Sequence, residues 1–226
     1  MTDQYNQENA LERTRIFLQP IAAPSILGLF AFAAAMFVVS INLAGWYGGK
    51  NSEMYVIPFV AAFGGLAQLL AGMWAYRARD ALATALHGMW GSFWMGYGLL
   101  YFFFATGLLS ATSHQFFIPM GYWFVTLAVI TGTLAIAATM QNVALAITLS
   151  LLAVGSAIGA IGFFSGLTNV LSAAGWVLLF SSLGAWYTAS GLLLESVFGH
   201  SVLPLGHRHA PAVESGAGEP AVIHGQ

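Results

Sequence analysis

Six long apolar runs, separated by short breaks, are the feature that most limits what this chain can fold into. An α-helix needs about 20 apolar residues to cross the hydrocarbon core of a bilayer. The runs cover residues 25–45, 55–76, 81–109, 116–140, 142–167 and 171–194. Only 6% of the residues are charged, whereas soluble domains carry about 25%. The sequence therefore predicts an all-α, multi-pass protein of the cell membrane, with six transmembrane helices in contact with the lipid bilayer.

The positions of the cationic residues predict how these helices are oriented. Lys and Arg in short loops stay on the cytoplasmic side of a membrane. With six spans, five of the six Lys and Arg residues fall on one side: Arg13, Arg15, Arg77, Arg79 and Arg208. Only Lys50 falls on the other side. We therefore expect both termini in the cytoplasm.

Composition divides the chain into a membrane domain and two tails. Residues 1–22 begin with a charged stretch that lacks the apolar core of a signal peptide, so we expect a retained cytoplasmic tail. Residues 23–199 form one membrane domain because all the breaks between the runs are short. Residues 200–226 are rich in Pro, Gly and Ala, which predicts a mobile cytoplasmic tail.

Several classes of function are disfavoured by what the chain lacks. Its formal net charge of −2 gives no electrostatic footprint for nucleic acid. It has no cysteine, and no pair of carboxylates or nucleophile with a base lies within the six runs. The runs hold one histidine, whereas a haem held between helices needs two facing ligands. We therefore expect neither an enzyme nor a bound metal or cofactor.

Two polar side chains within the runs are candidates for function, because such groups are expensive at bilayer depth. Gln68 lies mid-run in FGGLAQLLAG, after Gly64 and Gly65, and either joins helices by hydrogen bonds or lines a polar path. His87 follows the charged residues 77–80 by about two helical turns, and we expect it in a hydrated vestibule rather than in a proton relay. Ser92 is a further candidate for the polar residues of the pathway, although a hydroxyl can also bond to the preceding helical turn.

Two further stretches are unusual in composition. The run WGSFWMGYGLLYFFF at residues 90–104 is densely aromatic through the middle of a span, although core packing explains most single rings. The stretch APSILGLFAF at residues 23–32 places Pro24 in a first helical turn, where its missing N–H costs nothing. Gly28 then allows close approach of a neighbour, and Phe32 follows one turn later.

These stretches occur in an order that resembles the acetate uptake transporter family. The motifs are APSILGLFAF, FGGLAQLLAG, GSFW at 91–94, AGW at 174–176 and FGHSVLPLG at 198–206. The resemblance implies a six-helix protomer, commonly a homohexamer, with a pathway for acetate and similar small carboxylates. It also implies a narrow apolar constriction formed by Phe32, Trp90 and Leu149, with Gln68 as the glutamine of the second span.

The chain departs from the family pattern at several positions, which indicates a divergent member. Ala23, Ser25 and Ile26 stand where the family has Asn, Ala and Pro, and Trp90 stands where it usually has Tyr. Ala75 and Leu192 replace two glutamates. We expect transport of a small monocarboxylate together with a proton, collected first by Gln68 and its polar neighbours. The alternatives are a channel for another small solute, such as ammonia, or a membrane scaffold or sensor that acts through its tail.

Overall fold

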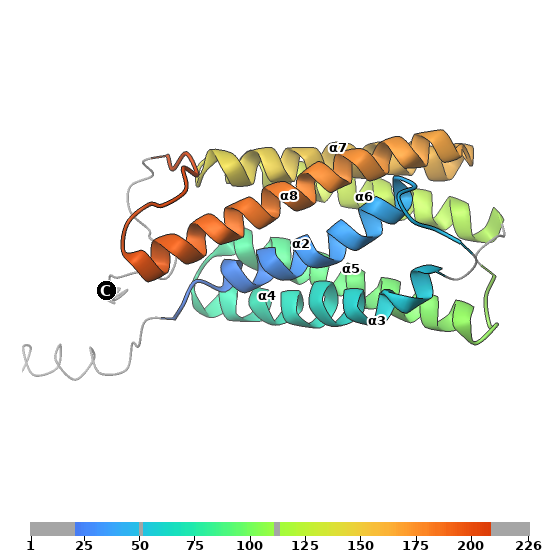
Figure 1. Cartoon of the computed structure of the whole chain (residues 1–226), viewed down its shortest axis with the longest axis horizontal. Helices are drawn as coiled ribbons and strands as arrows, with labels where there is room; N and C mark the ends of the chain where they lie inside the picture. Colours follow the sequence, from blue (N-terminus) through green and yellow to red (C-terminus); the bar gives the residue numbers. More distant parts are fainter. Residues whose placement is uncertain (1–20, 50–51, 111–113, 209–226) are drawn as a thin grey trace, which may run out of the picture.

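The computed structural model describes residues 21–49, 52–110 and 114–208, and within these ranges it is helical with no β-strand. Figure 1 shows the helices lying side by side along one long axis. Their bounds are α2 Pro24–Leu43, η1 Ser52–Tyr55, α3 Ile57–Val60, η2 Ala61–Ala67, α4 Gln68–Arg77, α5 Ala81–Ala105, α6 His114–Ala138, α7 Val143–Ser165 and α8 Thr168–Phe198. The predicted breaks between spans coincide with the ends of these helices.

Five helical stretches in the described ranges are long and apolar enough to cross a membrane: Pro24–Leu43, Ile57–Arg77, Gln115–Ala138, Val143–Ser165 and Thr168–Phe198. The sixth, α5, is 25 residues long and carries no Asp, Glu, Lys or Arg, but its glycines, tryptophans and tyrosines lower its hydropathy. It lies within the bundle beside α4 (Figure 1). The predicted all-α, multi-pass membrane architecture is confirmed.

The second span is not a uniform α-helix. After the short α3, residues Ala61–Ala67 form a π-helix, and α4 begins directly after it at Gln68. A π turn widens the helix and inserts a residue, and such turns are frequent at functional sites. Gly64 lies in this segment, where a Cβ would come within 2.5 Å of the Ala35 Cβ on α2. The absence of a side chain thus lets the widened turn pack against α2.

Polar caps and glycines mark where the helices begin and end. The side chains of Asp80 and Asn142 accept hydrogen bonds from the backbone N–H groups of Ala83 and Leu145, each at 2.8 Å, at the starts of α5 and α7. At the end of α7, Gly166 has a φ of 68°, a left-handed conformation that glycine adopts at little cost. These residues set where α5 and α7 begin and where α7 ends.

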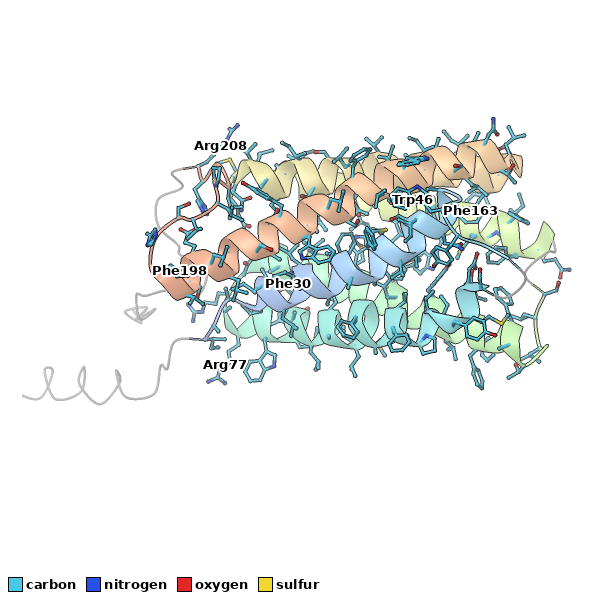
Figure 2. All side chains as sticks on the ribbon, in the orientation of Figure 1. Phe30, Trp46, Arg77, Phe163, Phe198 and Arg208 are labelled. Carbon is cyan, nitrogen blue, oxygen red and sulfur yellow. The ribbon has the colours of Figure 1, made fainter. Side chains whose placement is uncertain are left out.

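The two ends of the bundle differ in charge. Figure 2 places Arg77 and Arg208 at one end, and Trp46 and Phe163 at the other. Arg79 lies in the turn between α4 and α5, at the same end as Arg77. By the positive-inside rule we infer that the arginine end faces the cytoplasm.

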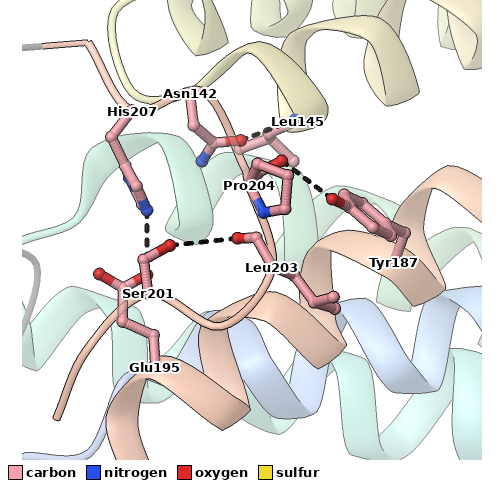
Figure 3. Close-up of polar contacts among 8 residues, drawn as sticks. All are labelled: Asn142, Leu145, Tyr187, Glu195, Ser201, Leu203, Pro204 and His207. Atoms are coloured by element: carbon pink, nitrogen blue, oxygen red, sulfur yellow. Dashed lines mark hydrogen bonds and ion pairs between the residues drawn. The ribbon is translucent and has the colours of Figure 1, made fainter.

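Residues 204–208, which belong to the stretch expected to be a mobile tail, contact the helical bundle. Leu205 is buried, and the carbonyls of Leu205 and Gly206 accept hydrogen bonds from Ala144 N–H at 3.0 Å and Val143 N–H at 3.1 Å. Figure 3 shows two further contacts of the segment. The Tyr187 hydroxyl donates to the Pro204 carbonyl at 2.9 Å, and His207 Nε2 lies 3.0 Å from Glu195 Oε2.

The physical reason is that the first turn of a helix has N–H groups without intrahelical partners. Residues 205 and 206 supply acceptors to the start of α7, so this segment is part of the folded domain. The proposed N-terminal tail, apart from residues 21–22, and residues 209–226 of the C-terminal tail lie outside the described residues.

The packed segment gives a prediction about stability. Leu205 lies against α8, where a Cβ on Gly191 would be 2.6 Å from the Leu205 Cδ2 atom. Leu205→Ala should destabilise the fold by about 2 to 5 kcal/mol, because it leaves a cavity. The melting temperature in detergent should fall by about 4 to 20 °C. Val202→Ala is the control, since Val202 is 43% exposed. Equal melting temperatures for the two variants would mean that the segment is not packed in solution.

Candidate functional site

A narrow cavity lies inside the bundle, where α2, α4, α5 and α7 meet. It is lined by Leu29, Phe32, Gln68, Leu86, His87, Thr148, Leu149 and Leu152. The space between these side chains has no room for a water molecule. The cavity therefore combines an apolar wall with three side chains that can donate and accept hydrogen bonds, Gln68, His87 and Thr148, and it is closed in this conformation.

The residues expected to form a constriction do lie together. Phe32, Trp90 and Leu149 are all at most 2% exposed. The rings of Phe32 and Trp90 meet edge to face with their centroids 5.6 Å apart, and Leu149 lines the cavity with Phe32. The indole N–H of Trp90 donates to Thr131 Oγ1 at 3.1 Å. This N–H is therefore already used, and the constriction presents an apolar surface.

Gln68 and His87 are buried beside this constriction with none of their polar atoms bonded. Both side chains are 0% exposed, and neither has a hydrogen-bond partner among the described residues. An amide that joined two helices would be bonded across them, so the structure favours a Gln68 that lines the cavity. Leaving such groups unpaired costs about 1 to 3 kcal/mol each. A cost of this kind is tolerated where a polar ligand supplies the partner during function.

The expected hydrated position of His87 is wrong. Gly28 is the reason, because its missing side chain leaves the space that the imidazole occupies. A Cβ on Gly28 would lie 2.4 Å from the Cε1 and Nδ1 atoms of His87. Close packing of α4 on α5 adds to this burial, since a Cβ on Gly72 would lie 2.6 Å from the backbone N of Gly88. His87 thus faces the interior of the bundle rather than a wet vestibule.

Ser92, also expected among the polar residues of the pathway, does not line the cavity. It is exposed on the protomer surface, and its hydroxyl donates to the Gly88 carbonyl at 2.8 Å. Ser92 is five residues beyond His87, which places it about 140° further round α5. The correction follows from helix rotation, which the sequence alone left open.

The four backbone positions singled out in the sequence are all buried, each at a crossing or a helix start. Pro24 is in the first turn of α2, as expected. Gly28 faces His87 and Gly64 faces Ala35, while a Cβ on Gly65 would come within 2.8 Å of Met95 Cγ. Close approach at these three glycines explains how the cavity residues are brought together.

Several residues of the site were missed from the sequence. Thr131 holds the Trp90 indole, and Thr148, Leu29, Leu86 and Leu152 line the cavity. The Thr148 hydroxyl donates to the Ala144 carbonyl of its own helix at 2.8 Å, as many helical threonine side chains do. No local pattern distinguishes Thr131, because its partner is 41 positions away.

A second hollow lies on the outer surface of α7 and is lined mainly by apolar side chains, with Arg208 at its edge. It holds no buried polar atom without a partner. Among the described residues, no group of three or more His, Cys, Asp or Glu side chains could hold a metal ion. The internal cavity is therefore the candidate site.

Known proteins share both the sequence pattern and the fold. A family model described as the GPR1/FUN34/yaaH family matches residues 8–206. The chain is 29% identical over 191 residues to the succinate-acetate/proton symporter SatP of Escherichia coli K12, covering 84% of this chain and 97% of that protein. It is 26% identical over 201 residues to acetate permease A of Emericella nidulans, covering 82% of this chain and 66% of that protein.

A solved structure has the same arrangement of helices. The bacterial acetate channel SatP matches with a TM-score of 0.75 at 26% identity. The match covers 82% of this chain and 99% of the channel. The likeness therefore extends over most of this chain.

The contact between Gly28 and His87 gives a second prediction. Gly28→Ala should destabilise the fold by about 1 to 3 kcal/mol, because the added methyl group overlaps the imidazole. Gly96→Ala is the matched control, since Gly96 is helical with open space at its Cβ, and alanine there should be neutral or stabilising by up to about 1 kcal/mol. Melting temperatures of both variants provide the measurement. Adding His87→Ala to Gly28→Ala should remove most of the loss of stability. If the loss of stability is unchanged, the His87 imidazole is not what opposes the alanine methyl group.

Proposed function

This chain belongs to the GPR1/FUN34/yaaH family, and we propose that it carries acetate and similar small monocarboxylates across the cell membrane together with a proton. The observation that carries this proposal is the pair of unbonded, fully buried side chains, Gln68 and His87, beside an apolar constriction. The relatives support the substrate class, since one is named a succinate-acetate/proton symporter and another an acetate permease.

The chemistry of the pair suits a carboxyl group in either protonation state. A glutamine side chain has two N–H donors and a carbonyl acceptor, and a neutral imidazole has one donor and one acceptor. The donors can bond to the oxygens of a carboxylate, and the acceptors can bond to the O–H of a carboxylic acid. The pair can therefore replace the water that the substrate loses when it leaves solution.

The constriction decides which form of the substrate passes. A simple carboxylic acid has a pKa of about 4, so less than about 1% of it is neutral at pH 7. Phe32, Trp90 and Leu149 offer no free donor to an anion, because the Trp90 N–H is bonded to Thr131. Moving a bare carboxylate past them costs far more than moving the neutral acid. Because the neutral acid passes at a lower cost than the anion, each substrate molecule that crosses carries a proton with it.

Passage also requires movement, because the cavity has no room for a water molecule in this conformation. Phe32 and Leu149 are the side chains that must turn aside, since both border the closed space. We place the opening step there. A π-helix next to Gln68 supplies a second element that can change its hydrogen bonding as the path opens.

We further propose that the chain assembles as a homo-oligomer, with the hexamer as the expected form. Many large apolar side chains on the outside of the bundle are exposed, including Phe59, Trp123 and Ile136. Such side chains contact lipid or a neighbouring copy in the membrane. Measuring the mass of the assembly in lipid nanodiscs tests this, and a monomer would contradict it.

Reconstituted vesicles test the coupling to protons. Uptake of labelled acetate, after subtraction of protein-free vesicles, should increase several-fold when an inward proton gradient is imposed. The neutral acid is the form that fits the constriction, so its supply should set the rate. If uptake responds only to the membrane potential and not to the proton gradient, the protein is an anion channel and the proposed coupling is wrong.

A substitution at the cavity tests which residues bind the substrate. Gln68→Leu keeps the size of the side chain but removes the unpaired amide, so the fold should stay equally stable or gain stability. Acetate uptake should nevertheless fall about tenfold, the effect of losing one hydrogen bond of about 1.4 kcal/mol.

Ser92→Ala is the control for this variant, because Ser92 is polar but lies outside the cavity. It should leave uptake unchanged. A Gln68→Leu protein that loses stability while its uptake per folded molecule stays normal would make Gln68 a structural residue.

A further inference from the structure

A second polar cluster lies at the end of the bundle opposite the arginines, and the proposed function does not use it. Glu53 is on the short helix η1, and Tyr97 and Tyr101 are on α5. The Tyr101 hydroxyl donates a hydrogen bond to Glu53 Oε2, and the Tyr97 hydroxyl donates to the Tyr101 oxygen at 3.1 Å. Glu53 forms no ion pair within the described ranges. Its carboxyl group is therefore joined to a chain of two hydroxyls.

These hydroxyls stand at the end of a row of aromatic rings that leads to the constriction. Trp90, Phe93, Tyr97 and Tyr101 are three or four positions apart on α5, which places them on one face of the helix. The ring centroids are 4.8 Å apart for Tyr101 and Tyr97, 5.8 Å for Tyr97 and Phe93, and 5.4 Å for Phe93 and Trp90. Trp90 then contacts Phe32. The row covers about 17 Å along the helix axis.

We propose that Glu53, Tyr101 and Tyr97 form a proton-delivery site, which transfers a proton to a carboxylate substrate before it reaches the constriction. This inference rests on the proposed function, because a proton is needed only if the neutral acid is the form that passes. The substrate is a small aliphatic carboxylate, and the proton comes from the aqueous medium on the Glu53 side.

The transfer balances at every atom. Protonated Glu53 gives its proton to the Tyr101 oxygen, Tyr101 gives its own to the Tyr97 oxygen, and Tyr97 gives its own to a carboxylate oxygen of the substrate. One O–H bond breaks and one forms at each hydroxyl, so both tyrosines end as they began. Glu53 ends as a carboxylate and is reprotonated from the medium. The hydroxyls can rotate to run the chain in this direction, since each is both a donor and an acceptor.

The groups around Glu53 are consistent with this role. The titratable side chains that face it are Tyr101 and Tyr97 from α5 and Tyr47 from the turn after α2. Burial, with the Glu53 charge as a second cause, raises the pKa of Tyr47, which therefore stays protonated. Its hydroxyl donates to the Val38 carbonyl at 2.9 Å, so Tyr47 is not a link in the chain.

Acetate uptake at two pH values tests the proposal with the full-length protein in vesicles whose Glu53 side faces the acetate. Glu53→Gln keeps the shape and the acceptor oxygen but cannot release a proton. At pH 7 its uptake should fall to about a tenth of the wild-type value. At pH 5, roughly a tenth of a carboxylic acid with a pKa of about 4 is already neutral in solution, and uptake should return to within about twofold of wild type. A structural defect would not be repaired by acid.

Two further variants complete the test. Tyr101→Phe keeps the ring contacts but removes the hydroxyl that links Glu53 to Tyr97. Its acetate uptake should fall as much as that of Glu53→Gln at pH 7 and should recover as much at pH 5. This variant replaces Glu53→Gln if the latter does not assemble. Tyr47→Phe should behave like wild type at both pH values, because its hydroxyl bonds only to a backbone carbonyl.

The outcomes separate this inference from the proposed function. No acetate uptake by the wild-type protein would overturn the proposed function. Normal wild-type uptake with an unaffected Glu53→Gln variant, or an equal fractional loss at pH 7 and pH 5, would overturn the proton-delivery site alone. After either of these two results, the cluster of Glu53, Tyr97 and Tyr101 would serve only to hold η1 against α5.

Discussion

Hydrocarbon offers no partner to a backbone N–H or carbonyl, and this constraint organises the whole molecule. It explains why the described ranges are helical, with glycines or polar side chains at several helix ends. It also explains the segment at residues 200–208, whose carbonyls bond to the first N–H groups of α7. Even the irregular part of the second span keeps its backbone paired, as a π-helix rather than a loop.

Against this background of paired backbone, the described buried side chains with an unpaired polar atom are Ser52, Gln68, His87 and Trp94, and two of them line one cavity. Gln68 and His87 are buried without partners beside Phe32 and Leu149, and glycines bring them there. Gly28 gives space to the imidazole, and Gly72 lets α4 and α5 approach closely. A larger side chain at either position would push the helices apart. Leaving Gln68 and His87 unpaired costs free energy. Gly28 and Gly72 also give up the apolar packing that a larger side chain would provide, and both costs arise around this cavity.

Polar groups occur at two depths, and the aromatic face of α5 connects them. The Glu53 cluster lies at one end, and the unpaired amide and imidazole lie inside. Between them the rings of Tyr97, Phe93 and Trp90 are in successive contact. A substrate that must lose its charge before an apolar constriction needs a proton source ahead of that point. In the mechanism proposed above, the Glu53 cluster is that source.

The sequence by itself determined the helical class and the number and approximate bounds of the spans, and the family resemblance pointed to Phe32, Trp90, Leu149 and Gln68. Hydropathy is a local property and the family motifs are short stretches of chain, so no contacts are needed to find them. Only the tertiary structure decided that His87 is dry, that Ser92 faces outward and that Leu205 is packed. These outcomes depend on how each helix is rotated about its axis and on which helices lie next to it. The same side chain is buried if its side of the helix faces a neighbour and exposed if that side faces outward. Glycines at helix crossings set that direction through contacts between residues far apart in the sequence.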